Sequence, residues 1–136
     1  TAVQKNYAAE FAAVAGRSSY GGMYTKYLVD LYTGILHQPA KAVDLSKTEI
    51  QNRPTPQVYA WYAWSLLSND QVAEAYEVFR QQVSGRALEG PELYYMGKLM
   101  QQLNKGYNAK EFFKAAYKNR YDLSVRRQEE LAGLDH

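Results

Sequence analysis

The sequence predicts an all-α fold in which antiparallel helix hairpins stack on one another. Apolar residues recur at helical spacing over most of the chain, and no stretch shows the alternation expected of a strand. The middle of the chain also superposes on its end after a shift of 34 positions, a period typical of helical repeat proteins. With 136 residues and 46% apolar content, the chain has the length of one domain and enough apolar side chains for a core.

The superposed positions have the geometry of paired helices. In the first block of each copy they stand at i, i+3, i+4 and i+7, which is one face of a helix. We expect the small residues Ala63 and Gly97 to face Ala75 and Ala109, so that paired helices approach closely. The two phenylalanines of the alignment should fill the space between neighbouring hairpins, which must stack because one hairpin cannot bury both faces. The superposed pairs are Tyr59 and Leu93, Tyr62 and Met96, Ala63 and Gly97, Leu66 and Met100, Ala75 and Ala109, Glu77 and Glu111, and Phe79 and Phe113.

The order of residue sizes in the two copies is large, large, small, large, then alanine and an aromatic residue. The copies are Tyr59-x-x-Tyr62-Ala63-x-x-Leu66 with Ala75-x-x-x-Phe79, and Leu93-x-x-Met96-Gly97-x-x-Met100 with Ala109-x-x-x-Phe113-x-x-Ala116. This order resembles the signature of the tetratricopeptide repeat family. The chain departs from it at Tyr59 and Leu93, where Trp is usual, and at Gln82, where a small residue is expected. The resemblance implies a short right-handed solenoid of stacked hairpins.

We expect a single helical repeat domain over residues 1–136. The repeats cover about 23–55, 56–89 and 90–121, and the first is the weakest copy, with one extra residue in its turn at His37. Residues 1–16 are expected to form the second helix of an incomplete earlier repeat, and 123–134 a capping helix. The capping helix should pack through one apolar stripe and turn its charged residues to water. That stripe consists of Val125, Gln128, Leu131 and Leu134.

The sequence offers little material for catalysis or for a metal site. The chain has no Cys, and its two histidines, His37 and His136, have no second ligand at metal-binding spacing. No phosphate-binding glycine motif is present. We therefore predict a protein that is not an enzyme, with no catalytic residue, metal or cofactor.

The charge pattern argues against nucleic acid as the partner. The formal net charge is only +2, and Lys110, Lys114 and Lys118 form a basic stripe without interleaved aromatic residues. A solvated outer face is the favoured interpretation of this stripe, and contact with nucleic acid or an acidic partner is the alternative. No apolar run reaches the length of a membrane span, so no membrane insertion is expected.

The resemblance also implies which residues line the concave face. In the family, side chains one, two and five positions after the first signature residue project from the first helix of each hairpin into the groove. For Trp61 a binding role is slightly favoured over packing, and for Trp64 the two interpretations are equally supported. The predicted partner-binding residues are Lys26, Asp30, Trp61, Trp64, Tyr94, Tyr95, Lys98 and Gln101.

These observations predict a non-catalytic protein-interaction module that binds a peptide or protein segment in the concave groove. One alternative is a structural scaffold or self-association segment of a larger protein. A second alternative is a receptor for a small molecule or glycan, because 13 Tyr and 2 Trp could supply an aromatic surface. The sequence indicates neither the partner nor the compartment.

Overall fold

The computed structural model describes residues 22–104, 106–120, 123 and 125–133, and these residues contain helices and no strand. The predicted all-α class is therefore confirmed. The helix expected over residues 1–16 lies outside the described residues. The helical elements are α2 (Gly22–Thr33), α3 (Pro39–Asn52), α4 (Pro56–Ser68), α5 (Val72–Val78), which continues as the π-helical turn η1 (Phe79–Val83), α6 (Gly90–Gln102), α7 (Gly106–Lys118) and α8 (Val125–Ala132).

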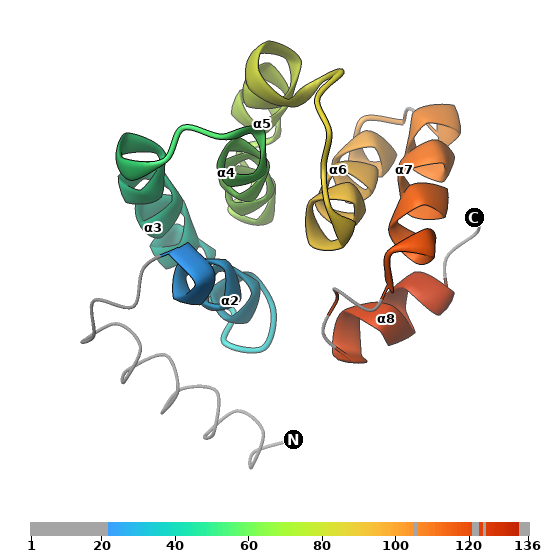
Figure 1. Ribbon diagram of the computed structural model, residues 1–136, viewed down its shortest axis with the longest axis horizontal. Coiled ribbons are helices and arrows are strands. Elements are labelled where there is room, and N and C mark those ends of the chain that lie inside the picture. The colour runs from blue at the N-terminus through green and yellow to red at the C-terminus, as the bar shows by residue number, and fades with distance from the viewer. Residues whose placement is uncertain (1–21, 105, 121–122, 124, 134–136) are drawn as a thin grey trace.

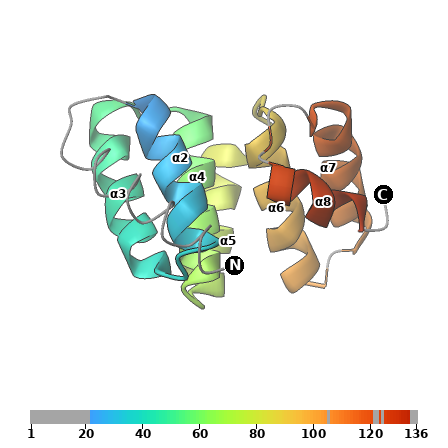
Figure 2. The same cartoon turned by 90° about the horizontal axis from the view of Figure 1, so that it is seen from below.

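The helices form consecutive hairpins that follow an arc (Figure 1). Helices α2, α4 and α6 line the inside of the arc, and α3, α5 and α7 lie outside. Each inner helix packs on the outer helix that follows it, and α4 also contacts both neighbouring inner helices. Helix α8 lies across the open side of the arc, next to α6 and α7 (Figure 2).

Local signals explain where several helices begin. Pro39, Pro56 and Pro91 stand in the first turns of α3, α4 and α6, where the missing N–H of proline costs no hydrogen bond. Thr55 caps α4 with its hydroxyl, which accepts a hydrogen bond from the Val58 amide at 3.3 Å.

The hairpin turns share one backbone feature, a residue in the left-handed region. Asp70 and Asn104 have φ values of 61° and 59°, and they stand 34 positions apart in the sequence. His37 has a φ of 50° in the first hairpin, one position later than the period would place it. Asn and Asp tolerate this conformation better than other non-glycine residues, which explains why the second and third turns carry them.

The close approach of α6 and α7 depends on Gly97. A β-carbon at this position would lie 2.5 Å from Cε1 of Phe113, so the ring of Phe113 occupies the place of a side chain. Phe113 thus packs within its own hairpin, so the expectation that it fills the space between neighbouring hairpins was wrong. Half-buried Phe79 does contact Phe112 of the next hairpin, with ring centres 5.9 Å apart. Ala63 and Ala75 are fully buried, in line with the small residues expected there.

Two further predictions, both about the capping helix, are corrected by the structure. Val125 was expected to pack against the stack but is 72% exposed, whereas Arg127, expected in water, is only 5% exposed. The reason is a polar site on the inner face that receives the guanidinium, as described below. Gln82 lies in the π-helical turn η1, so the departure from the family pattern coincides with a widened turn.

Replacement of Gly97 by Ala tests the packing of α6 on α7. A helical Gly→Ala change at an open position stabilises by roughly 1 kcal/mol. Here the added methyl group would collide with the ring of Phe113, so we expect a loss of about 1–3 kcal/mol in unfolding free energy, measured by urea denaturation. Gly133→Ala is the control, because its methyl group would stay 3.6 Å from the nearest atom. Stabilisation by Gly97→Ala would contradict the close packing.

Replacement of His37 by Gly tests the strain of the first turn. A non-glycine residue in the left-handed region costs about 1–2 kcal/mol, and the greater freedom of unfolded glycine offsets part of the gain. We expect His37→Gly to raise the unfolding free energy by about 0.5–1 kcal/mol and to raise Tm accordingly. Lys47→Gly is the matched control, since Lys47 is exposed within α3 and its replacement should cost about 1 kcal/mol. A loss at both positions would show that the turn is not strained.

Candidate inner-face site

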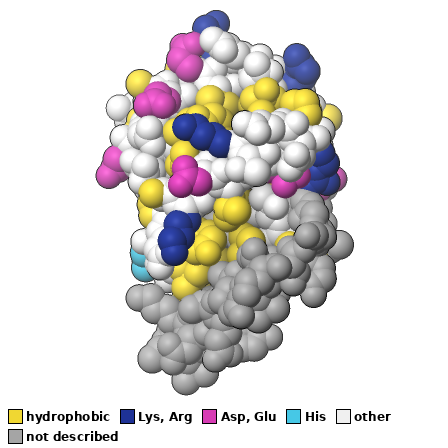
Figure 3. All heavy atoms as spheres, turned by 90° about the vertical axis from the view of Figure 1, so that its left-hand side faces the viewer, with side chains coloured by type: hydrophobic (Ala, Val, Ile, Leu, Met, Phe, Trp, Pro, Cys, Tyr) yellow, Lys and Arg dark blue, Asp and Glu magenta, His cyan; other side chains and the backbone are white. Residues whose placement is uncertain are grey.

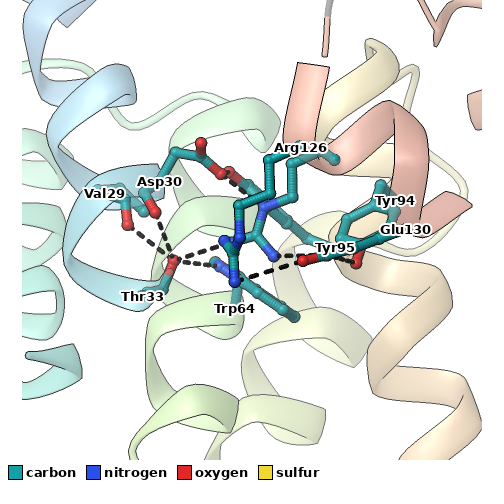
Figure 4. A network of polar contacts seen from close by, with 9 residues as sticks. Val29, Asp30, Thr33, Trp64, Tyr94, Tyr95, Arg126 and Glu130 are labelled. Carbon is teal, nitrogen blue, oxygen red and sulfur yellow. Dashed lines mark hydrogen bonds and ion pairs between the residues drawn. The ribbon is translucent and has the colours of Figure 1, made fainter. Parts of the chain in front are cut away.

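A cluster of polar and aromatic side chains fills the inside of the arc. Figure 4 shows them converging from α2, α4 and α6 toward side chains of α8. We call this cluster the Arg127 site. It consists of Asp30 and Thr33 of α2, Trp64 of α4, Tyr94 and Tyr95 of α6, and Arg127 and Glu130 of α8.

Helical periodicity places these residues on the faces that meet. Asp30 and Thr33 stand three positions apart on α2, and Arg127 and Glu130 stand three apart on α8, so each pair shares one helix face. Leu131, one position further along α8, is fully buried. Helix α8 therefore presents an arginine, a glutamate and a leucine to the rest of the molecule.

The guanidinium of Arg127 donates to three different acceptors. Its Nε donates to Asp30 Oδ1 at 2.8 Å, and its Nη1 donates to Glu130 Oε2 at 3.1 Å. Its Nη2 donates to Thr33 Oγ1 at 3.5 Å. Each of the three nitrogens thus has its own oxygen, and the two carboxylates balance the buried charge.

Three aromatic rings surround the same guanidinium. The Cζ atom of Arg127 lies 5.2 Å from the ring centre of Trp64, 5.5 Å from that of Tyr94 and 6.0 Å from that of Tyr95. These distances are in the range of cation–π contacts. Trp64 and Tyr95 also stack nearly parallel, with ring centres 4.6 Å apart and planes 9° apart. The rings exclude water from the cation and fix one another.

A further set of hydrogen bonds orients the acceptors and rings. Tyr95 donates its hydroxyl to Asp30 at 3.1 Å, and Tyr94 donates to Glu130 at 2.6 Å. Trp64 Nε1 donates to Thr33 Oγ1 at 2.8 Å, and that hydroxyl donates to the carbonyl of Val29 at 2.8 Å. The Thr33 hydroxyl uses its hydrogen in the bond to the Val29 carbonyl. Both lone pairs of its oxygen can therefore accept, one from Trp64 and one from Arg127.

The protonation states of the site are fixed around neutral pH. Burial, together with donation to Glu130, raises the pKa of Tyr94 well above that of a free phenol, and burial beside Asp30 does the same for the pKa of Tyr95. For Arg127, burial alone would lower the pKa, but the Asp30 carboxylate and the neighbouring oxygens outweigh it and raise the pKa. The phenols therefore act as hydrogen-bond donors and the arginine as a permanent cation.

Among the described residues, little free space remains beside the Arg127 site while α8 is in place. The hollow beside the site, lined by residues that include Asp30, Tyr95 and Arg127, has a volume of only about 30 Å³. That is room for a water molecule and not for a peptide. A second molecule cannot contact the buried rings of this face unless α8 moves.

The structure brings together some of the predicted binding residues and separates others. Asp30, Trp64, Tyr94 and Tyr95 all belong to the Arg127 site, and the three aromatic residues are between 1% and 6% exposed. Trp61 is buried at another point, near Glu92. Lys26 forms an ion pair with Glu89 at 3.7 Å. Lys98 is half-buried and Gln101 exposed on α6, and neither takes part in the site.

Sequence reasoning missed Thr33, Arg127 and Glu130. One signal was present: Leu123, Arg127 and Leu131 recur every four residues, the spacing of a buried helical stripe, and all three are buried. An arginine in such a stripe is more often solvated, so the spacing alone did not reveal its partner.

A second buried polar group lies between the first turns of the inner helices. Glu92 on α6 is 1% exposed, and its Oε2 atom and Trp61 Nε1 are buried without a hydrogen-bond partner. Burial raises the pKa of Glu92, and the nearby charge of Lys26 acts in the opposite direction. Burial of Glu92 in its ionised form therefore destabilises the folded state.

Among the described residues, two further hollows open between helices elsewhere. The hollow between α2 and α3 has a volume of about 450 Å³ and is lined by Leu28, Tyr32 and Leu45 together with polar and charged residues. Figure 3 shows this side of the molecule, where apolar side chains form a band interrupted by basic and acidic groups. The other hollow, of about 520 Å³, lies between η1 and α7 beside Phe79 and Phe112. Neither contains a cluster of chemically reactive groups.

Within the described part of the chain, no group of His, Cys, Asp and Glu residues has the arrangement of a metal site. The helices of that part are also too short or too polar to cross a membrane. No protein-family model matches the chain, and no curated protein and no solved structure is similar enough to count as a match. Fold and site define the class: in its described part, an all-α protein whose inner face binds a guanidinium of its last described helix, α8.

The cost of burying Glu92 is testable through pH. The pKa of Glu92 is higher in the folded than in the unfolded state. The destabilisation is therefore fully present when the pH exceeds the folded-state pKa. It vanishes once the pH falls below the unfolded-state pKa of about 4.3. We expect Glu92→Gln to raise Tm by a few degrees near neutral pH, with the gain shrinking to nothing in acid. Thermal melts over this range provide the measurement. Glu89→Gln is the control, since Glu89 is largely exposed. A gain that persists in acid would contradict the explanation.

Proposed function

We propose that this chain is a non-catalytic protein-interaction module, a short right-handed solenoid of the tetratricopeptide type that binds a peptide or protein segment across its concave face. The arrangement of inner and outer helices in an arc supports the solenoid. The left-handed turn residues Asp70 and Asn104, spaced by one period, support a repeated hairpin. Fold alone does not supply a ligand, so the proposal depends on the inner face itself.

One observation carries the proposal: the inner face already binds a helix. Helix α8 is held there by a buried arginine, which finds two acceptors on α2 and aromatic rings on α4 and α6. A surface that binds one helical segment with specific polar contacts has the chemistry to bind another. The partner of this module is therefore a protein segment.

The alternative of a structural scaffold or self-association segment is favoured by the same observation. An α8 helix that belongs to a second copy could enter the same face. Light scattering over a concentration series distinguishes this alternative, since self-association would appear without any partner. The alternative of a glycan receptor has less support, because Trp61, Trp64, Tyr94 and Tyr95 are buried, whereas Tyr27, beside the site, is 54% exposed.

Site-directed photocross-linking tests the proposal. A photoreactive residue is placed at Lys98 on the inner helix α6 or, as the matched control, at exposed Lys114 on the outer helix α7. We expect a discrete protein product from position 98 and at least about tenfold less of it from position 114, because a groove partner contacts the first helices of the hairpins. Lys98→Glu should weaken the same product. Equal products from both positions would contradict binding across the concave face.

A further inference from the structure

We propose that the part of the Arg127 site on α2, α4 and α6 recognises an arginine carried on a helix of a partner protein, and that α8 is the built-in competitor for it. This receiving part consists of Asp30, Thr33, Trp64, Tyr94 and Tyr95. The partner segment carries the pattern Arg-x-x-Glu-Leu, which in α8 is Arg127, Glu130 and Leu131. The inference rests on the proposed function and names the partner class. It is derived from the contacts that α8 makes.

The chemistry of the site selects a guanidinium over an ammonium. Three nitrogens in one plane meet three separate oxygens: those of Asp30 and Thr33 on α2, and that of Glu130 on the bound helix itself. A lysine ammonium is a single point and cannot reach all three in this geometry. The flat guanidinium is also the cation that packs well against the rings of Trp64 and the two tyrosines.

The glutamate and the leucine of the pattern have their own contacts. Glu130 accepts the hydroxyl of Tyr94 at 2.6 Å while it also accepts from Arg127, so it joins the arginine to α6. Leu131 is fully buried one turn after Arg127 on the same helix. An arginine without these two neighbours would leave Tyr94 unpaired and an apolar gap, which costs affinity.

The polar character of the site fits recognition better than stability. A buried ion pair seldom stabilises a fold more than well-packed apolar residues of the same size, because both charges lose their hydration. A capping helix needs only an apolar stripe, as at Leu123 and Leu131. Packing of a capping helix does not require the oriented acceptors around Arg127. These acceptors instead make the position specific for an arginine.

Helix α8 is suited to replacement by an equivalent segment. It has eight residues, and helices of this length are not stable alone in water, so docking holds it in helical form. Its other side, including Val125 and Glu129, is exposed. Among the described residues, Arg127 is the only cation that forms an ion pair with Asp30. Release of α8 leaves a carboxylate and a ring cluster that complement an incoming arginine.

A peptide-binding experiment with the full chain tests the inference. The probe is a fluorescent peptide with the sequence of residues 123–133, capped at both ends. The receptor is the double variant Arg127→Ala and Leu131→Ala, in which α8 has lost its two anchors. We expect this variant to bind the probe. The unchanged chain should bind the probe on the order of 100-fold more weakly, because its own α8 competes at millimolar effective concentration. Fluorescence anisotropy gives both affinities.

Two altered probes supply matched controls. The probe with Arg127→Lys should bind at least about tenfold more weakly, since the ammonium loses two of three acceptors. The probe with Glu129→Gln should bind within about threefold of the original, because Glu129 is exposed on the side of α8 that faces away from the site. Absence of binding to the folded double variant, or equal loss with both altered probes, would overturn the inference.

A single variant keeps the inference testable if the double variant does not fold. In the Arg127→Ala chain, ethylguanidinium should enter the vacated space and raise Tm, whereas ethylammonium at the same concentration should not. The unchanged chain should respond to neither beyond the general effect of salt. No difference between the two cations in Arg127→Ala would overturn a guanidinium site.

The two proposals fail in different ways. Probe binding without a position-98 cross-link in cells would leave the guanidinium site intact and remove the proposed function. If Asp30→Asn does not change the yield of the cross-linked product, the proposed function stands. The Arg127 site is then not where the partner binds.

Discussion

The ion pair between Arg127 and Asp30 is the interaction on which the inner face depends. It joins the last described helix to the first described one, and the partners are 97 positions apart in the chain. A buried guanidinium loses its hydration, and only a complete set of acceptors offsets that cost. The acceptors lie on α2 and α8 and the rings on α4 and α6, so the site exists only when all four helices are in place.

Because α8 covers the Arg127 site, a ligand of this site must displace α8 to bind. In an open groove a partner adds contacts to an exposed surface. Here Trp64, Tyr94 and Tyr95 are already buried, and the hollow that the described residues form beside Asp30 holds no more than a water molecule. The ligand replaces the contacts of α8 with its own. Its binding free energy is therefore the difference between two similar quantities, the free energy of its own contacts and that of the α8 contacts. Discrimination then comes from polar geometry, since apolar area would be buried by either occupant.

Much of the helical framework could be predicted from periodicity. The spacing of large and small residues indicated paired helices from about residues 56 and 90, and α4 and α6 begin at Pro56 and Gly90. The resemblance to tetratricopeptide repeats implied that Asp30, Trp64, Tyr94 and Tyr95 lie on the inner side. Three features could not be predicted because they depend on distant partners. The burial of Arg127 needs Asp30 and two tyrosines, the exposure of Val125 follows from it, and the placement of Phe113 on Gly97 requires knowledge of how the helix pair is rotated.

The contact between Tyr95 and Asp30, together with the ion pair, ties the two ends of the hairpin series to each other. Stacked repeats ordinarily touch only their neighbours, so their terminal units loosen first and independently. In this chain a loss of order in the first hairpin removes an acceptor from the last helix, and unfolding of that helix removes a ligand from the first hairpin. The series therefore behaves as a loop with no free end among its described helices. Its cooperativity should exceed that of an open stack of equal length, and the contacts that close it are among the slowest to form.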